Sequence, residues 1–176
     1  YRFAVARVLD KRPHYRSPEV EAVLAQAEEL ANGPSVIAQT LTDGELPFGT
    51  ITDEAGNTVQ ISQGNIERYL ASRDARVRRE VWKVAADAHI SFDDTLAASL
   101  QGTIKRDVFY ARAHNYDTAL DAALDAQNIP PEVFHNLIAT VRKNYPTWQR
   151  FFRIRKKLLG VDELHPGDLH APLGQN

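Results

Sequence analysis

The chain contains no cysteine among its 176 residues. This absence excludes a disulfide framework, thiolate zinc ligands and a thiol nucleophile. Any metal site would therefore have to use histidine, aspartate or glutamate side chains. Because stable disulfides are rare in reducing compartments, the absence of cysteine also suits a cytoplasmic protein, and we expect a cytoplasmic location.

Long hydrophobic runs are also missing. The purely apolar segments extend over only a few residues, whereas a helix needs about 20 apolar residues to cross a bilayer. The first five residues do not have the pattern of a signal peptide. The 21 basic and 23 acidic residues nearly balance, so the net charge favours neither nucleic acid nor an anionic membrane. We expect neither as a partner.

Methionine is absent as well, including from the first position. Phe3, Ala6 and Leu9 carry a helical apolar stripe from the very start, with no capping residue before it. At the other end, residues 171–176 follow no element that would close a fold. We therefore expect the sequence to be a fragment of a larger protein.

Proline is absent between Pro47 and Pro130. Within this window the sequence predicts one helix over about 72–114, capped by Ser72 and Asp74. Such a helix is roughly 60 Å long, whereas a compact domain of this chain length is about 40 Å across. We therefore expect an elongated helical array that belongs to a larger fold. The predicted buried stripe consists of Val77, Val81, Val84, Ala88, Phe92, Leu96, Leu100, Ile104, Val108 and Ala111.

The remaining residues also favour a mainly α fold. Two segments rich in β-branched residues, 48–52 and 58–62, flank a turn-like stretch and predict one β-hairpin at about 48–62. A stripe of large apolar side chains from Phe134 to Leu159 predicts further helix. Pro146 interrupts this stripe and predicts a kink or break near 143–145, and Gly160 ends the helix.

Six ordered motifs carry a resemblance to a known family. They are Ser72–Glu80 (SRDARVRRE), Leu96–Gly102 (LAASLQG), Val108–Leu120 (VFYARAHNYDTAL), Asn128–Val133 (NIPPEV), Arg155–Gly160 (RKKLLG) and Glu163–Leu169 (ELHPGDL). Over about 110 residues they resemble the oligoendopeptidase F group of zinc metallopeptidases, within the thimet oligopeptidase-like superfamily. Residues 14–70 resemble the small N-terminal domain of that family more loosely.

The resemblance implies a mostly helical cytoplasmic enzyme whose deep channel admits short peptides. It also implies two domains, an N-terminal domain at 1–85 and the beginning of the catalytic domain at 86–176. Members of the family hold zinc with H-E-x-x-H on one helix and a further glutamate downstream, and the first glutamate acts as general base. In the family this motif lies beyond the point that corresponds to Asn176.

The zinc motif itself is absent from the chain. None of the six histidines, at positions 14, 89, 114, 135, 165 and 170, is followed by glutamate or has a second histidine four residues away. We therefore assign no catalytic, cofactor-binding or metal-binding residue and expect no metal on this segment. These 176 residues alone should not hydrolyse peptides, and the parent protein needs a C-terminal catalytic half.

Two other patterns favour structural roles. His165, Asp168 and His170 lie within six residues, but Pro166 and Gly167 make this segment a loop or a helix start. Zinc would also need a ligand from elsewhere. Asp93 and Asp94 are adjacent on a predicted helix and so do not face each other, which favours solvated surface over a catalytic carboxylate pair.

Seven basic residues between 142 and 157, with no acid among them, alternate with Tyr145, Trp148, Phe151 and Phe152. This pattern could bind single-stranded nucleic acid, but the aromatic residues fall on the predicted core stripe. A solvated helix face is favoured, with Asp121, Asp125 and Glu132 as candidate ion-pair partners. Three hypotheses remain: a peptidase segment that supplies scaffold, a non-catalytic helical interaction module able to self-associate through exposed apolar faces, and a nucleic-acid binder through 142–157.

Overall fold

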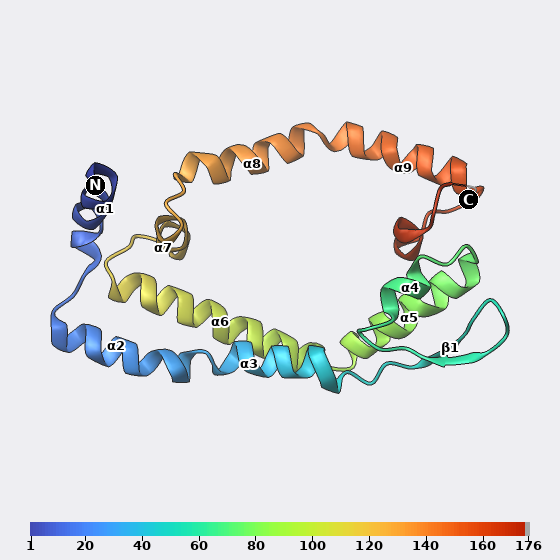
Figure 1. Cartoon of the computed structure of the whole chain (residues 1–176), viewed down its shortest axis with the longest axis horizontal. Helices are drawn as coiled ribbons and strands as arrows, with labels where there is room; N and C mark the ends of the chain where they lie inside the picture. The colour runs from blue at the N-terminus through green and yellow to red at the C-terminus, as the bar shows by residue number, and fades with distance from the viewer. Residues whose placement is uncertain (175–176) are drawn as a thin grey trace. The chain divides into compact units, whose positions relative to one another are not determined.

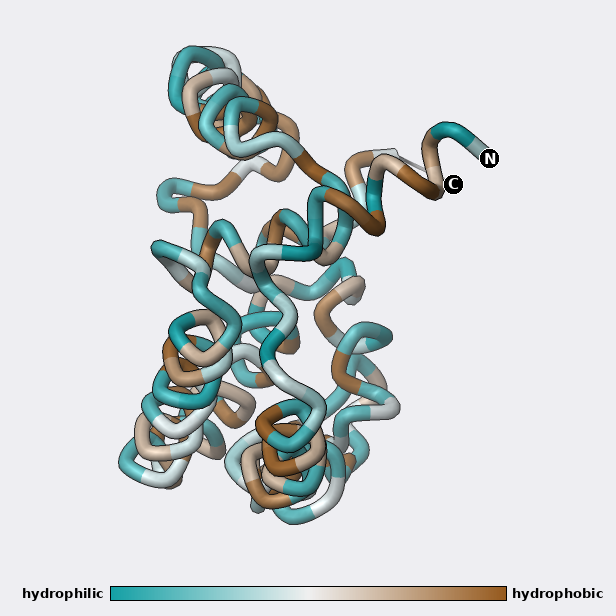
Figure 2. Tube along the Cα trace, turned by 90° about the vertical axis from the view of Figure 1, so that its left-hand side faces the viewer, coloured by the Kyte–Doolittle hydropathy of each residue, from teal (hydrophilic) through white to brown (hydrophobic). Residues whose placement is uncertain are grey.

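The structure, a computed structural model, describes residues 1–174. Helices account for most of these residues, and a single two-stranded antiparallel sheet is present among them (Figure 1). Hydrophobic and hydrophilic residues alternate along the helical coils (Figure 2), as expected for amphipathic helices. The prediction of a mainly α chain with one hairpin is confirmed. Within residues 1–174, no helix has the length and apolar character that a membrane span requires.

The chain forms two compact units, each built from two separate stretches of sequence. The first unit contains Tyr1–Thr40 and Asp94–Ala139, and the second contains Leu41–Asp93 and the described part of Thr140–Asn176. The predicted division into 1–85 and 86–176 stays a prediction about the whole protein. In this structure one helix runs without interruption through residues 85 and 86.

The first unit consists of helices. Its elements are α1 (Arg2–Lys11), η1 (Arg12–His14), α2 (Pro18–Ala31), α3 (Gly33–Thr40), α6 (Asp93–Ala113), α7 (Ala119–Ala126) and the first part of α8 (Pro131–Lys143). Helix α6 lies along α2 and α3 (Figure 1). The hydroxyl of Tyr110 on α6 donates a hydrogen bond of 3.1 Å to the Leu24 carbonyl on α2.

The second unit combines the hairpin with helices. Its elements are η2 (Leu41–Glu45), β1 (Thr50–Thr52), β2 (Thr58–Gln60), α4 (Ile66–Leu70), α5 (Ala75–Ile90), α9 (Tyr145–Leu159) and η3 (Pro166–His170). Strands β1 and β2 pair with Ile51 opposite Val59, which confirms the predicted hairpin. Its core unites the hairpin with α4 and α5 through Ile51, Ile61, Leu70, Val77 and Val81.

The prediction of one long helix over 72–114 is wrong in one respect. The segment forms two helices, α5 and α6, separated by Ser91 and Phe92. The Ser91 hydroxyl donates to the Ala88 carbonyl at 2.7 Å, and such side-chain bonds compete with the helical backbone pattern. The acidic pair Asp93 and Asp94 then begins a new helix, where negative charge is favourable. The predicted start is confirmed, because the Asp74 carboxylate caps α5 by accepting from the Arg76 amide at 2.8 Å.

The predicted buried stripes are only partly buried. On α5, Val77, Val81 and Ala88 are buried as expected. On α6, however, Leu100 and Ile104 are 62% and 54% exposed. On α9, Trp148 and Phe152 are exposed as well. The amphipathic pattern correctly marked these faces as apolar, but no described residue covers them.

The predicted break at Pro146 is confirmed. Helix α8 ends at Lys143 and α9 begins at Tyr145, with Asn144 between them. Proline cannot donate a backbone hydrogen bond and is tolerated in the first helical turn, where no such bond is needed. The predicted end at Gly160 is confirmed too, because Gly160 adopts φ +64°, a conformation that glycine accommodates without a Cβ clash.

A buried carboxylate connects three elements of the second unit. Asp168 of η3 is fully buried and accepts hydrogen bonds from Arg78 of α5, at 3.0 Å from Nε and 2.6 Å from Nη2. The same Arg78 donates to the carbonyls of Ser72 and Arg73, both at 2.9 Å. Arg155 of α9 donates from Nε to the Asp168 carbonyl at 2.9 Å and from Nη2 to the Ala171 carbonyl. Both guanidinium groups and the carboxylate therefore have partners.

Opposing influences act on the pKa of the Asp168 carboxyl. Burial raises this pKa, whereas the His165 backbone amide and the Arg78 guanidinium lower it, and the net pKa lies below the ordinary value of 3.8. A carboxyl whose pKa is lower in the folded protein than in the unfolded chain stabilises the fold above the unfolded pKa. That stabilisation is lost as the pH falls through the folded pKa.

The substitution Asp168→Asn tests this cluster. Because it leaves the buried Arg78 charge uncompensated, we expect it to lower the free energy of unfolding by about 3–5 kcal/mol at neutral pH. The difference from wild type should shrink as the pH falls below about 4, where the Asp168 carboxyl of the unfolded wild-type chain begins to gain a proton. The free energy of unfolding is measured by urea unfolding, followed by the fluorescence of Trp82 and Trp148, which both lie in the second unit. Asp87→Asn, which breaks the exposed Lys83–Asp87 pair, is the control and should cost less than about 1 kcal/mol.

In the first unit, a substitution at Gly102 tests the packing of α6 against α3. A Cβ at this position would lie 2.6 Å from Cγ of Pro34 and 2.8 Å from its Cβ. Replacing glycine by alanine inside a helix normally stabilises it by about 1 kcal/mol. Here we expect Gly102→Ala to destabilise the protein by about 1–3 kcal/mol instead, because the rigid proline ring cannot move aside without displacing α3. The neighbouring exposed change Gln101→Ala should stay within about 0.5 kcal/mol in the same thermal or urea unfolding measurement. A stabilised Gly102→Ala variant would show that α3 and α6 are not packed as described.

Candidate functional site

The described residues do not form a zinc site. Among residues 1–174, no three histidine, cysteine, aspartate or glutamate side chains are grouped so that they could hold a metal ion. Zinc in proteins usually has three or four such ligands. The described side chains of this segment therefore do not fit the metal that the family resemblance implies.

The His165, Asp168 and His170 segment has a structural role. Asp168 is fully buried and is occupied by Arg78 and by the His165 backbone amide, which donates to its Oδ2 at 2.9 Å. A carboxylate with these partners caps η3 and carries an ion pair. These contacts support a structural role for the 165–170 segment and not a metal site.

The acidic pair and the basic segment lie on the surface. Asp93 and Asp94 are exposed at the start of α6. On α9 only Arg155 is buried, and it binds the Asp168 region instead of a ligand. Within the first unit, Asp121 accepts from the Thr118 hydroxyl and Asp125 pairs with Arg7, and the pairing of Asp121, Asp125 and Glu132 with the basic segment stays a prediction. Both carboxylates are held by residues nearer to them in the first unit.

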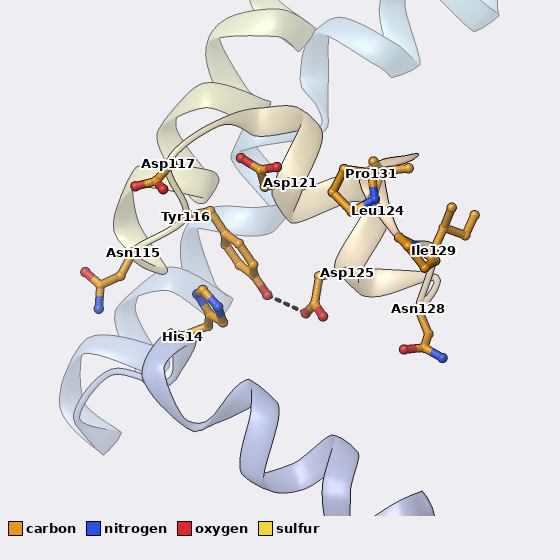
Figure 3. Close-up of a pocket in the computed structure, with 11 residues that line it drawn as sticks. His14, Asn115, Tyr116, Asp117, Asp121, Leu124, Asp125, Asn128, Ile129 and Pro131 are labelled. Carbon is orange, nitrogen blue, oxygen red and sulfur yellow. Dashed lines mark hydrogen bonds between the residues drawn. The ribbon is translucent and has the colours of Figure 1, made fainter. Parts of the chain in front are cut away.

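A pocket of about 390 Å³ lies in the first unit, where α7 meets η1 and the loops on either side of α7 (Figure 3). Its polar lining includes His14, Tyr116 and Asp125, which come from η1, from the segment after α6 and from α7. Leu124, Ile129 and two prolines supply apolar surface. This combination of a concave apolar surface with a few polar groups is typical of ligand pockets.

Backbone geometry at the end of α6 positions these side chains. Asn115 adopts φ +59°, and the Tyr116 amide donates back to the Ala111 carbonyl at 2.9 Å. This left-handed residue ends the helix. The Asn115 side chain donates to the Pro13 carbonyl at 3.1 Å, and the His14 ring stacks on the Tyr116 ring with centroids 3.7 Å apart and planes within 1°. The end of α6 is thereby attached to η1.

Tyr116, Asp125 and Arg7 form the central polar chain of the site. The Tyr116 hydroxyl donates to Asp125 Oδ2 at 2.7 Å, as the dashed line in Figure 3 shows. Arg7 of α1 donates to Asp125 Oδ1 at 3.1 Å and to the Asp125 carbonyl at 2.7 Å. Charge-assisted bonds of this kind are stronger than neutral ones. They hold α1 against α7.

His14 of the site and His114 beside it are also fixed by carbonyl groups. His14 Nδ1 donates to the His114 carbonyl at 2.9 Å, and His114 Nδ1 donates to the Tyr110 carbonyl at 2.9 Å. In each case the acceptor is a backbone oxygen, so the proton resides on Nδ1. His114 Nε2 lies 3.4 Å from the Glu21 carboxylate on α2. The rings therefore connect η1, α6 and α2.

The pKa values of Tyr116 and Asp125 are shifted apart. Burial, followed by the hydrogen bond to Asp125 and the charge of that group, raises the pKa of Tyr116 to about 12. The hydrogen bond from Tyr116, together with Arg7 and against the effect of burial, lowers the pKa of Asp125 below its ordinary 3.8. At neutral pH the phenol stays protonated and the carboxylate stays ionised, each bound to the other. The hydrogen bond between Tyr116 and Asp125 is therefore kept at neutral pH and fixes two side chains that line the pocket.

The sequence did not reveal this site. His14 and Tyr116 are about 100 positions apart, and neither belongs to a spacing that marks a catalytic or metal motif. The one available signal was indirect, because Tyr116 lies inside the longest motif shared with the family, 108–120.

Tyr116→Phe tests the hydrogen bond to Asp125. The ring and its stacking on His14 remain, but the strongest influence that lowers the pKa of Asp125 is removed. We expect the Asp125 carboxyl to titrate below 3.8 in wild type and at a higher pH in the variant, as followed by carbon-detected NMR of the carboxyl. An unchanged titration would contradict the geometry described. Tyr15→Phe, at an exposed tyrosine nearby, is the control and should leave the Asp125 titration in place.

Known relatives of the chain are bacterial peptidases. The chain is 38% identical to Oligopeptidase PepF of Bacillus subtilis over 98% of its length, which is 26% of that relative. It is 32% identical to Group B oligopeptidase PepB of Streptococcus agalactiae, over 96% of the chain and 28% of the relative. A crystal structure of oligoendopeptidase-F from Enterococcus faecium matches 98% of the chain with a TM-score of 0.93 and 36% identity, over 33% of that structure. The chain thus spans about a quarter to a third of the length of these relatives.

Two family models match different parts of the chain. The model described as Oligopeptidase F matches residues 1–48. The model described as Peptidase family M3 matches residues 68–172, which is more than half of the chain and includes α5, α6 and the buried Arg78–Asp168 pair. The chain therefore belongs to peptidase family M3, in its oligoendopeptidase F branch.

Proposed function

We propose that these residues form the scaffold part of a zinc endopeptidase that hydrolyses short peptides. The observation that supports this proposal most strongly is the match of residues 68–172 to peptidase family M3. The relatives named oligopeptidase or oligoendopeptidase F align with nearly the whole chain, yet the chain spans only about a quarter to a third of their length.

The catalytic zinc belongs to residues outside these 176. The chain lacks H-E-x-x-H, and within residues 1–174 no group of side chains suits a metal ion. When bound, a zinc ion would polarise the scissile carbonyl and activate a water molecule. The present residues can contribute only position and shape to that reaction, and the segment alone is inactive in this proposal.

The exposed apolar faces support a structural role within a larger protein. Leu100 and Ile104 on α6 and Trp148, Phe151 and Phe152 on α9 are exposed. Monomeric proteins rarely leave such large side chains grouped on the surface without a partner. We propose that the remaining polypeptide covers these faces in the whole protein, and that the isolated segment self-associates through them. A cytoplasmic location, suited by the absence of cysteine, completes the proposal.

Expression of the complete gene tests this function. We expect the full-length protein to cleave an internally quenched short peptide, to lose that activity on treatment with a zinc chelator and to regain it when zinc is added back. The 176-residue chain, assayed at the same concentration, should cleave nothing.

The matched control replaces the glutamate of the H-E-x-x-H motif in the full-length protein by glutamine. This change keeps both histidine ligands but removes the general base, so zinc should still bind while hydrolysis falls sharply. A reading frame without the motif, or hydrolysis that a chelator leaves untouched, would contradict the proposal.

A further inference from the structure

A second pocket of about 470 Å³ lies beside the first in the first unit. It shares His14, Tyr116 and Asp125 with the first pocket and extends toward α6 and the end of α1. Its volume lies within the range of about 300–1,000 Å³ that is typical of sites for small molecules. The proposed scaffold function leaves this pocket without a role.

Short side chains form one wall of the second pocket. Four alanines of α7, at positions 119, 122, 123 and 126, line it together with Ala111 of α6. Their spacing of three and four residues places them on the same face of α7. Because an alanine side chain ends at Cβ, this wall is apolar and leaves space that a larger residue would fill.

Aromatic rings form the other walls. Tyr15, Tyr110 and His114 line the pocket along with the stacked pair of His14 and Tyr116. The Tyr110 and His114 rings also lie nearly parallel, at an interplanar angle of 17° and with centroids 6.2 Å apart. Rings attract further rings in offset or edge-on arrangements.

Several polar atoms of these rings are already engaged by the protein. Tyr110 donates to the Leu24 carbonyl, Tyr116 donates to Asp125, and His14 donates to the His114 carbonyl. The rings can therefore offer a ligand mainly carbon surface. A ligand that needs many hydrogen bonds from these groups would have to break existing ones.

The charges that line the pocket do not select an ion. Lys11 is the one cation, and Asp107 and Asp125 are the anions. Asp125 is paired with Arg7, and Asp107 is paired with Arg106, neither of which lines the pocket. Once these pairs are counted, the Lys11 ammonium is the single charge that remains, which disfavours a cationic occupant and is compatible with a neutral one.

We propose that this pocket binds the neutral aromatic side chain of a peptide. The ring would lie against the alanine wall and between the aromatic walls, where it is removed from water. The choice of a peptide as the source rests on the proposed function, since the named relatives are oligopeptidases. The proposal concerns peptide binding alone, because no described residue of this segment holds a metal ion.

The test uses the full 176-residue chain and two blocked, uncharged amino acids. N-acetyl-tryptophanamide presents a ring, and N-acetyl-alaninamide presents the same backbone without one. Methyl NMR of the alanines reports on the pocket directly. We expect saturable shifts at the Ala122 and Ala123 methyl groups with the tryptophan probe and none with the alanine probe. Equal shifts with both probes, or no shifts with either, would overturn the proposal.

Ala122→Leu fills the pocket and should weaken binding of the tryptophan probe by at least about tenfold, the scale on which an apolar pocket rejects a group of the wrong size. Ala98→Leu makes the same change at an exposed position of α6 and should leave the affinity unchanged. Should Ala122→Leu fail to fold, Tyr15→Ala removes an exposed wall of the pocket instead and is expected to weaken binding as well. If a folded Ala122→Leu or Tyr15→Ala variant binds the tryptophan probe as tightly as wild type, the proposed site is wrong.

The full-length protein separates this proposal from the proposed function. Cleavage of peptides without any probe-induced shift at Ala122 would overturn the pocket alone. Binding of the tryptophan probe in a protein that cleaves no peptide would overturn the peptide as its source. If the full-length protein cleaves peptides, and Ala122→Leu cleaves aromatic peptides more slowly than Ala98→Leu does, both the proposed function and the proposed pocket are supported.

Discussion

The second unit depends on one buried ion pair. Asp168 has no exposed surface, and Arg78, 90 positions away, provides the positive charge that allows it to remain ionised there. Transfer of an unpaired carboxylate into a protein interior is very costly, so neither partner can leave without the other. Arg155 attaches a third element, α9, because its guanidinium donates to the backbone carbonyl of Asp168. The packing of η3 on α5 and the anchoring of α9 therefore follow from a single electrostatic requirement.

The first unit contains a similar ion pair, between Arg7 and Asp125, whose side chains are less buried. The Asp125 carboxylate of α7 accepts hydrogen bonds from Arg7 and Tyr116. Arg7 thereby attaches α1 to α7, and Tyr116 attaches the end of α6. Helix α1 has no buried residue of its own. Polar and aromatic contacts, more than a hydrophobic core, hold this N-terminal helix in place. The same contacts leave two adjoining pockets, since rings and short alanines do not fill the space between these helices.

Local features were predictable from the sequence because their causes are local. The hairpin followed from β-branched segments around a turn, the start of α5 from Asp74, the break before α9 from Pro146 and the end of α9 from Gly160. The break at Ser91 was missed because serine is tolerated inside helices, and only its bond to the Ala88 carbonyl, together with the two acids that follow, marks the end of α5.

Features that depend on distant residues were not predictable in the same way. The amphipathic stripes correctly identified apolar faces, but periodicity cannot say whether a face is covered, and Leu100 is exposed. The roles of Asp168 and Asp125 required knowledge of which arginine approaches each carboxylate across about 90 and 118 positions of sequence. The pockets were missed for the same reason, because their walls come from segments about 100 residues apart.

We propose that this part of a family M3 peptidase is scaffold and that the zinc is held elsewhere in the polypeptide. Metal analysis of two purified proteins tests it most directly, with zinc measured per molecule after extensive dialysis. We expect about one tightly bound zinc ion in the full-length protein and none in the 176-residue chain. Stoichiometric zinc on the 176-residue chain would contradict it.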